Sequence, residues 1–293
     1  MTPQPPENRD KDAGRWSDLS RPPLNAGALR RALLRPGTLW SALDVVPVTG
    51  STNSDLVARA AAGELSEGTV LVAEEQSAAR GRLDRRWSAP PRSGLFVSVY
   101  LTPTVPLARW GWLPLLAGVA TAAALSRSAG VDTALKWPND VLVTVDGVER
   151  KAGGILAERA ADGVVLGIGL NVSLTADELP VPTAASLALA GARNLDRDPL
   201  LRAVLRSLEH WYGEWQAVDG DPAACRLQEA YAAGCATLGR QVRADLPGDR
   251  SLVGEAVALD ADGRLVLATP DGVQHPVDAG DIVHLRPAAG GYA

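Results

Sequence analysis

The sequence predicts an α+β protein: a mixed β-sheet with helices, followed by a small all-β module. From Val45 to about Leu238, helical and strand patterns alternate, and turns such as Asp146-Gly147 and Asp162-Gly163 are typical of hairpins. Beyond Leu238 only short strands with close turns remain. A module of about 50 residues with five strands suits an SH3-like barrel.

The individual elements follow from these patterns and from turn residues. Helices are expected at 54–62, after the capping candidate Asn53, and at 112–128, 200–217 and 222–233. Strands of the larger part are expected at 69–73, 95–101, 141–145, 155–158 and 164–172. Strands of the small module are expected at 241–246, 252–259, 264–268, 273–277 and 282–285. The larger domain is placed at 37–237 and the small one at 238–288.

Residues 1–36 are expected to form a disordered or loosely held tail. They contain six prolines and eleven charged residues with little apolar periodicity. Such a segment buries too little surface to offset the entropy lost on ordering.

Composition excludes several classes of protein. The 293 residues carry a net charge of −5 and are 46% hydrophobic, which is typical of a globular chain of about two domains. Cys225 and Cys235 form no zinc or disulfide pattern, and the polar N-terminus does not resemble a secretory signal. The apolar window 110–125 is too short for a membrane span and predicts a buried helix. We expect a cytoplasmic protein.

An arginine-rich loop is expected at residues 80–92. It contains five Arg and one Asp, a local charge of +4. Gly81 and Gly94 favour a loop over a helix, and backbone amides beside glycine add hydrogen-bond donors. The loop is expected to attract phosphate or nucleic acid; the alternative is a solvated charged surface.

Only three of the 29 basic residues are lysines, and Lys136 and Lys151 lie in dense motifs. A lysine retained in an arginine-rich chain indicates a need for a compact ammonium. Residues 135–141 place Lys136, Asn139 and Asp140 before an apolar strand. This set suits Mg-ATP, because a carboxylate can hold the metal, an ammonium can neutralise phosphate, and an amide can meet a base edge. Alone, its Pro-Asn-Asp tripeptide is more often a turn.

Two glycine-containing strands are further candidates. Lys151 directly precedes Gly153-Gly154, where a ligand could approach the backbone; a hairpin end with a bulge is the alternative. Residues 167–171 repeat the theme but lack the third glycine of a dinucleotide-binding fingerprint. Residues 50–54 offer hydroxyls and an amide at a helix start, of which capping explains at least one. The histidines at 210, 275 and 284 lie outside these motifs, which disfavours a Ser-His or His-metal mechanism.

Taken in order, these motifs resemble those of the biotin protein ligases. The resemblance is carried by residues 50–53 (GSTN), Gln76 with 80–90, 136–140 (KWPND), 151–158 (KAGGILAE) and 167–171 (GIGLN). The Lys-Trp-Pro-Asn-Asp segment is the most diagnostic, and the match runs from Val45 to the end. The resemblance implies a catalytic sheet of the biotin/lipoate ligase type, similar to class II synthetases, with an SH3-like C-terminal domain.

The resemblance also implies an activity and its residues. Biotin would be activated by ATP, with Mg²⁺, as biotinyl-5'-AMP and transferred to a lysine of a biotin carboxyl carrier protein domain. Catalytic roles fall on Lys151 and Arg82, and the metal ligand on Asp140. Biotin contacts fall on Ser51, Thr52, Asn53, Gln76, Arg80, Gly81, Arg82, Lys151 and Gly154. Nucleotide contacts fall on Arg82, Arg85, Trp87, Lys136, Asn139 and Asn171.

Two departures from the family's pattern concern the arginine-rich loop. Ala79 stands where a glycine is usual, and Asp84 replaces a small residue. If position 79 requires a positive φ, alanine there costs about 1 kcal/mol. We expect Asp84 to pair with a neighbouring arginine and to bias loop closure.

The resemblance sets expectations for partners as well. Fewer than 45 Pro-rich residues precede the matched region, so we expect a single-function ligase without an N-terminal DNA-binding domain, and neither nucleic-acid nor membrane partners. Monomer and homodimer both stay open. The nearest alternative is a lipoate or octanoate ligase or transferase of the same superfamily. An RNA-binding module is disfavoured by the net charge, and a biotin sensor without turnover is a third alternative.

Overall fold

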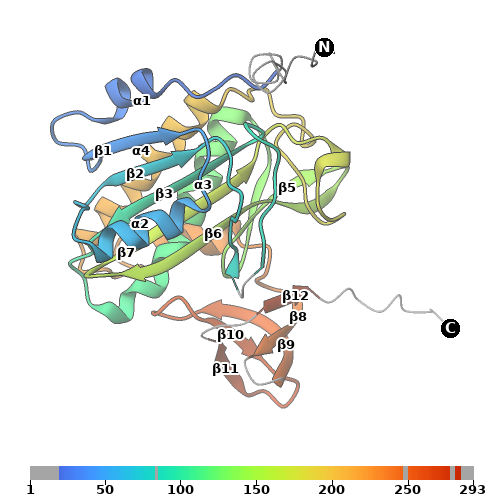
Figure 1. Ribbon diagram of the computed structural model, residues 1–293. Helices are drawn as coiled ribbons and strands as arrows, with labels where there is room; N and C mark the ends of the chain where they lie inside the picture. Colours follow the sequence, from blue (N-terminus) through green and yellow to red (C-terminus); the bar gives the residue numbers. More distant parts are fainter. Residues whose placement is uncertain (1–19, 83–84, 247–249, 278–280, 285–293) are drawn as a thin grey trace, which may run out of the picture.

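The computed structural model describes residues 20–82, 85–246, 250–277 and 281–284. Two parts follow one another in the chain (Figure 1). Within the described residues, the larger part contains a mixed sheet of seven strands, and the smaller part an antiparallel sheet of five. This confirms the predicted α+β fold with a small C-terminal β domain.

The large sheet has the strand order β1-β2-β3-β7-β6-β5-β4. Only β1 and β2 pair in parallel, and the other neighbours are antiparallel. The predicted turn at Asp146-Gly147 is confirmed, because both residues have positive φ and link β5 to β6. The second hairpin turns one residue earlier than predicted, at Ala161-Asp162, since Gly163 already pairs in β7. The strands are β1 (Ala42–Val46), β2 (Thr69–Ala73), β3 (Gly94–Leu101), β4 (Thr133–Lys136), β5 (Asp140–Val145), β6 (Val148–Ala160) and β7 (Gly163–Asn171).

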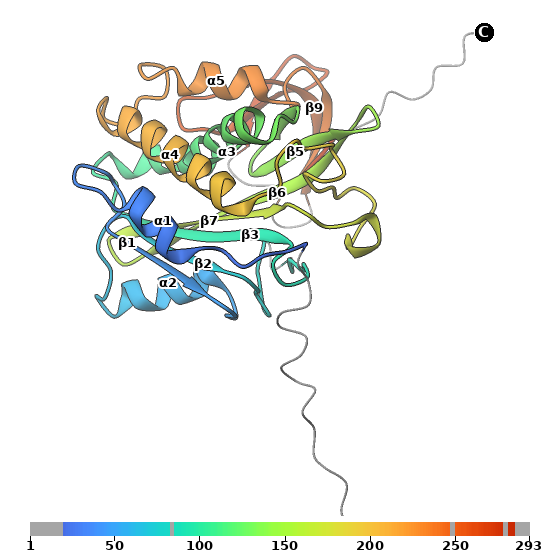
Figure 2. The ribbon, with the colours of Figure 1, turned by 90° about the horizontal axis from the view of Figure 1, so that it is seen from above.

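Helices cover both faces of this sheet (Figure 2). On one face, α2 (Thr52–Ala61) packs through Leu56 against Tyr100 of β3. On the other, α3 (Leu113–Ala129) and α4 (Arg197–Gln216) bury the main core. The apolar window is thus a buried helix, as predicted, and no helix in the described part of the chain is long and apolar enough to cross a membrane.

Three further helical segments are short: η3 (Leu107–Trp112), η4 (Ala176–Glu178) and α5 (Leu227–Gly234). The predicted helix at 222–233 is therefore shorter than expected. Its first residues form turns, because Arg226 adopts a left-handed backbone conformation with φ 61°.

The prediction of a loosely held tail at 1–36 is wrong for its later part, whereas residues 1–19 lie outside the described chain. Helix α1 (Ala26–Leu33) begins at the cap Asn25 and buries Leu29 and Leu33. Just before it, the Leu24 amide donates to Glu74 Oε1 at 2.6 Å. Local composition gave no sign of this order because the stabilising partners are distant in sequence.

A buried ion pair completes this anchor. Arg197 Nη1 lies 2.7 Å from Glu74 Oε2, and Arg197 also donates to the carbonyls of Pro22 and Gly94. Glu74 and Gly94 stand at the two ends of the segment that contains the arginine-rich loop. The N-terminal segment, α4 and the base of that loop are therefore joined at one point.

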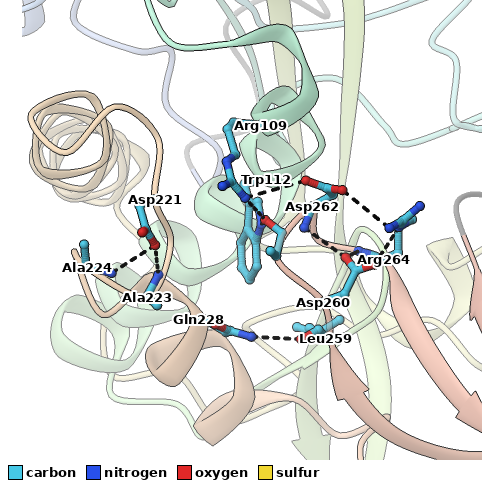
Figure 3. Close-up of polar contacts among 11 residues, drawn as sticks. Arg109, Trp112, Asp221, Ala223, Ala224, Gln228, Leu259, Asp260, Asp262 and Arg264 are labelled. Carbon is cyan, nitrogen blue, oxygen red and sulfur yellow. Dashed lines mark hydrogen bonds and ion pairs between the residues drawn. The ribbon is translucent and has the colours of Figure 1, made fainter. Parts of the chain in front are cut away.

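The small domain docks through the turn between β9 and β10 (Figure 3). Its Ala261 carbonyl accepts from Trp112 Nε1 at 2.8 Å and from Arg109 at 2.7 Å. A Cβ at Gly111 would lie 2.6 Å from the carbonyl oxygen of Asp262, so this approach requires glycine. The strands are β8 (Gln241–Leu246), β9 (Arg250–Leu259), β10 (Leu265–Ala268), β11 (Gln274–Val277) and β12 (Asp281–His284), in the order β11-β10-β9-β8-β12.

The same turn reaches the Lys-Trp-Pro-Asn-Asp segment. Trp137 Nε1 donates to the carbonyl of Gly263 at 3.0 Å, and the Trp137 amide donates to Thr237 Oγ1 at 3.1 Å. The small domain is thus fixed against the strand that carries Lys136.

Candidate active site

Glycines form the floor of a cavity of about 1350 Å³ at the N-terminus of α2. Gly154 of β6 pairs with Gly169 of β7, and Gly167 pairs with Ser98 of β3. Glycine therefore occupies three neighbouring positions on this face of the sheet, which leaves the backbone of β6 and β7 open to a ligand there. A Cβ at Gly167 would lie 2.1 Å from Asn53 Oδ1, so the close approach of α2 requires glycine there.

One end of the cavity, which we term the polar end, is formed by Thr52, Asn53, Gln76, Arg80 and Ser98. The Thr52 amide donates to Gln76 Oε1 at 2.8 Å. Ser98 Oγ lies 2.7 Å from Thr52 Oγ1 and donates to Asn53 Oδ1 at 2.6 Å. The polar end is therefore an ordered set of hydroxyl and amide groups.

A carboxylate behind this wall connects two of these residues. Glu158 Oε2 accepts from Asn53 Nδ2, and Glu158 Oε1 accepts from Arg80 Nη2, both at 2.8 Å. Arg80 also donates to Ser54 Oγ at 3.0 Å. The guanidinium of the first loop arginine is thus bound to the sheet and to α2.

The other end, which we term the cationic end, is formed by Arg82, Arg85, Lys136, Asp140 and Lys151. Lys151 Nζ lies 2.6 Å from Asp140 Oδ1 and 5.8 Å from the ring centre of Trp87. The two charged residues approach because Asp140 pairs with Gly154 across β5 and β6. This end of the cavity therefore combines four cations with one carboxylate, which Lys151 contacts directly.

Burial and neighbouring charges shift the pKa of two of these cations. Burial lowers the pKa of Lys136; Asp140 opposes this shift, and Lys151 and Arg85 add to it. Burial likewise lowers the pKa of Arg82, again opposed by Asp140 and reinforced by Arg85. Clustered, partly desolvated cations of this kind favour a polyanionic ligand, which would relieve their mutual repulsion.

Two side chains that line the cavity, Asn171 and Trp87, have a buried polar atom without a described hydrogen-bond partner. Asn171 Nδ2 donates to the Ala185 carbonyl at 2.9 Å, whereas its buried Oδ1 has no partner among the described residues. The buried Nε1 of Trp87 also lacks a described partner. Asn139 Nδ2 donates to the Ile155 carbonyl at 2.9 Å, which fixes the orientation of this amide.

The small domain contributes to the cavity wall with Arg240, Ile282 and His284, which sequence reasoning missed. His284 Nδ1 lies 3.4 Å from Arg240 Nη1, which can only donate, so Nε2 carries the proton and donates to Thr237 at 3.1 Å. The pKa of His284 is lowered to about 4 by burial, Lys136 and Arg240. No local motif marks these residues, since domain docking brings them to the site.

All residues assigned from the resemblance line this one cavity. From the α2 region and the arginine-rich loop these are Ser51, Thr52, Asn53, Gln76, Arg80, Gly81, Arg82, Arg85 and Trp87. From the sheet they are Lys136, Asn139, Asp140, Lys151, Gly154 and Asn171. Ser98 also lines it, and Glu158 lies behind the wall, although neither was assigned a role.

The two departures in the loop have different outcomes. Ala79 is buried and is not among the described residues with positive φ. The cost of alanine in a positive-φ conformation therefore does not arise. Asp84 lies outside the described residues.

Comparisons with known proteins identify the family of this chain. The model of the biotin/lipoate A/B protein ligase family matches residues 45–174, and that of the biotin protein ligase C terminal domain matches residues 237–285. The biotin--[acetyl-CoA-carboxylase] ligase of Mycobacterium tuberculosis is 44% identical over 273 residues, which cover 92% of this chain and 98% of the relative. The chain belongs to the biotin protein ligase family.

Other members of the family extend this comparison. The bifunctional ligase/repressor BirA of Escherichia coli is 31% identical, and the match covers 81% of this chain and 72% of BirA. The structure of the biotin protein ligase from Aquifex aeolicus in complex with biotin and ATP superimposes with a TM-score of 0.69 at 27% identity. That match covers 85% of this chain and all of the Aquifex chain.

Proposed function

We propose that this protein is an ATP-dependent biotin ligase. It forms biotinyl-5'-AMP from biotin and ATP, releases pyrophosphate, and then transfers biotin to a lysine of a biotin carboxyl carrier protein domain. The observation that carries this proposal is one cavity in which β6 joins a polar end to a cationic end, in a chain of this family. A ligand with a neutral polar ring and an anionic tail fits such a cavity.

In the first step, a carboxylate oxygen of biotin attacks the α-phosphorus of ATP, and pyrophosphate leaves. Both reactants are anions, so cations fixed in place are needed to align them and to stabilise the charge that develops. We assign this role to Lys151, whose ammonium exchanges Asp140 for the biotin carboxylate and the α-phosphate. Arg82 and Lys136 are assigned to the phosphate oxygens.

The cavity can also accommodate the nucleotide base and the metal. Asn171 Oδ1 offers an unused acceptor to the adenine amino group, and Asn139 also lines the cavity. No group of three or more potential metal ligands occurs in the described chain, but Mg²⁺ needs only one or two carboxylates besides substrate phosphates. Asp140 would supply that carboxylate, and bound Mg²⁺ would neutralise phosphate charge.

In the second step, the ε-amine of the carrier lysine attacks the carbonyl carbon of the mixed anhydride, and AMP leaves. The anhydride is sensitive to water, so residues 80–92 must close over it until the carrier docks. We assign retention of the intermediate to Arg82. A cytoplasmic location, where ATP and carboxylase carrier domains are available, follows from this proposal.

Hydrogen-bonding capacity favours biotin over the lipoate or octanoate alternative. The polar end presents ordered amide and hydroxyl groups, which suit the ureido ring of biotin. The dithiolane ring of lipoate and the alkyl end of octanoate offer these groups no hydrogen bond, so either ligand would displace water from a polar wall without replacing the hydrogen bonds of that water, which is costly.

Biotin-dependent ATP–pyrophosphate exchange, followed by transfer to a purified carrier domain, tests the proposal. We expect exchange with biotin but not with lipoate or octanoate, and labelling of a carrier domain but not of its Lys→Arg variant. Exchange that depends on lipoate or octanoate would favour the alternative. Biotin binding without exchange would identify a sensor instead.

A further inference from the structure

Glu158 is the acidic residue at the polar end of the cavity. It lies on β6 four residues beyond Gly154, beside which the Lys151 ammonium lies, and four residues correspond to about 13 Å along an extended strand. Its side chain is 25% exposed and does not line the cavity, but its two oxygens bind two residues that do, Asn53 and Arg80. Any effect on a ligand must therefore act through those residues.

The carboxylate fixes the orientation of Asn53. Asn53 Nδ2 donates to Glu158 and to the carbonyl of Leu156, so Asn53 Oδ1 faces the buried hydroxyl of Ser98. An amide held by acceptors on its nitrogen side and a donor on its oxygen side has one favourable orientation. The donor and acceptor pattern of the polar end is set in this way.

The carboxylate also cancels the charge of Arg80. The Arg80–Glu158 ion pair leaves the polar end with no net charge from these two residues, whereas the cationic end has four cations and one carboxylate. The difference matters because biotin has an uncharged ring at one end and a carboxylate at the other. An unpaired guanidinium beside the ring would instead attract a second anionic group.

We propose that Glu158 is a specificity-determining positioning residue that keeps the polar end of the cavity electrically neutral, so that it accepts an uncharged ligand ring. The inference rests on the proposed function. It concerns ligand selection at the polar end and predicts little effect on ATP, whose phosphates are assigned to the other end.

The test compares binding of biotin with binding of azelaic acid, an α,ω-dicarboxylate that is anionic at both ends. Isothermal titration calorimetry on the full chain measures both ligands for the wild type and for Glu158→Gln. The substitution leaves Arg80 without its counter-charge, so we expect biotin to bind about tenfold more weakly, as for loss of a charged hydrogen bond. Azelaic acid should bind about tenfold more tightly for the same reason. The KM for ATP should change less than about twofold, since Glu158 is remote from the cationic end.

The double variant Arg80→Gln/Glu158→Gln restores neutrality, so it should lose the gain in azelaic acid binding. Arg80→Gln alone leaves an unpaired carboxylate, weakens biotin, and should bind no additional azelaic acid; it also serves if Glu158→Gln does not fold. Glu229→Gln is the matched control, because Glu229 pairs with Arg226 in an exposed contact on α5 away from the cavity.

The inference is overturned if Glu158→Gln and Glu229→Gln bind azelaic acid equally well, or if Arg80→Gln gains azelaic acid affinity. Failure of the proposed function gives a different result. In that case the wild type shows no biotin-dependent pyrophosphate exchange, while the azelaic acid comparison still reports on the charge balance of the polar end.

Discussion

Lys151 Nζ lies 2.6 Å from Asp140 Oδ1, so the ammonium that we assign to the reacting carboxylate is held by a carboxylate of the protein. In the proposed mechanism, Asp140 orients the lysine before substrate arrives and releases it when the biotin carboxylate and phosphate enter. The Lys151 side chain is 36% exposed and lines the cavity, so a ligand there can reach the ammonium. A surface-accessible ion pair contributes little to folding, so its function can be tested separately from stability.

Lys151→Met is expected to abolish activation while leaving the fold intact. Loss of one preorganised charge at the reacting centre typically costs a factor of about 100 to 1000 in kcat. Single-turnover formation of biotinyl-AMP measures the effect, and thermal unfolding provides the control. A folded variant with the wild-type rate would remove Lys151 from the mechanism.

Arg82→Gly is expected to release the intermediate. Arg82 is half-buried and lines the cavity, and we assign it to the phosphate of the adenylate. Without it, biotinyl-AMP should form but escape and label lysines on serum albumin. Streptavidin blots of albumin incubated with the variant, biotin and ATP measure this. Labelling no higher than with the wild type would contradict the assignment.

Gly167→Ala is expected to destabilise the protein by about 1–3 kcal/mol, as for other overpacked sites. The added Cβ would lie 2.1 Å from Asn53 Oδ1, so the start of α2 must move. Biotin affinity should fall as well, because Asn53 belongs to the polar end. Chemical denaturation and biotin titration measure the two effects. Wild-type stability would show that α2 shifts without cost.

Gly213→Ala is the same substitution at a glycine with free space around it, and here we expect stability to rise. Gly213 is exposed within α4, and nothing lies within 4 Å of a Cβ built there. The substitution should stabilise the protein by about 0.5–1 kcal/mol through helix propensity, without affecting biotin binding. A loss of stability in Gly213→Ala would contradict this expectation.

His284 predicts a pH dependence of stability. Its pKa is lowered from 6.5 to about 4 in the folded protein, so the unfolded chain binds the proton first as pH falls. The contribution is fully present above pH 6.5 and is lost as pH falls toward 4. Between pH 7 and pH 5, His284→Asn should therefore lose less stability than the wild type, by a few degrees in Tm. Parallel Tm curves for the two proteins would contradict this.

Sequence patterns predicted those parts of the fold whose signals are local. The strands at 69–73 and 241–246 match the structure at both ends, because apolar runs and turn residues define them. Helix α1 was missed, since its order depends on Arg197 and Glu74 far along the chain. Strands β1 and β4 were missed as short edge strands, which bury little surface.

The same distinction applies to the candidate site. Residues such as Lys136 and Lys151 occur in dense motifs, so the sequence identified them and the structure brings them together. Glu158 and His284 reach the site through pairing with Arg80 and through docking of the small domain. Glu158 ends the segment 151–158 that carries the resemblance, but neither its pairing with Arg80 nor the docking of His284 can be predicted from neighbouring residues in the chain.

The structure of this protein bound to a non-hydrolysable analogue of biotinyl-5'-AMP tests the account most directly. We predict the ureido ring at Thr52, Asn53 and Gln76, the acyl-phosphate beside Lys151, and the adenine at Asn171. An analogue bound in the reverse direction, or with Lys151 still paired to Asp140 and distant from the phosphate, would contradict the account.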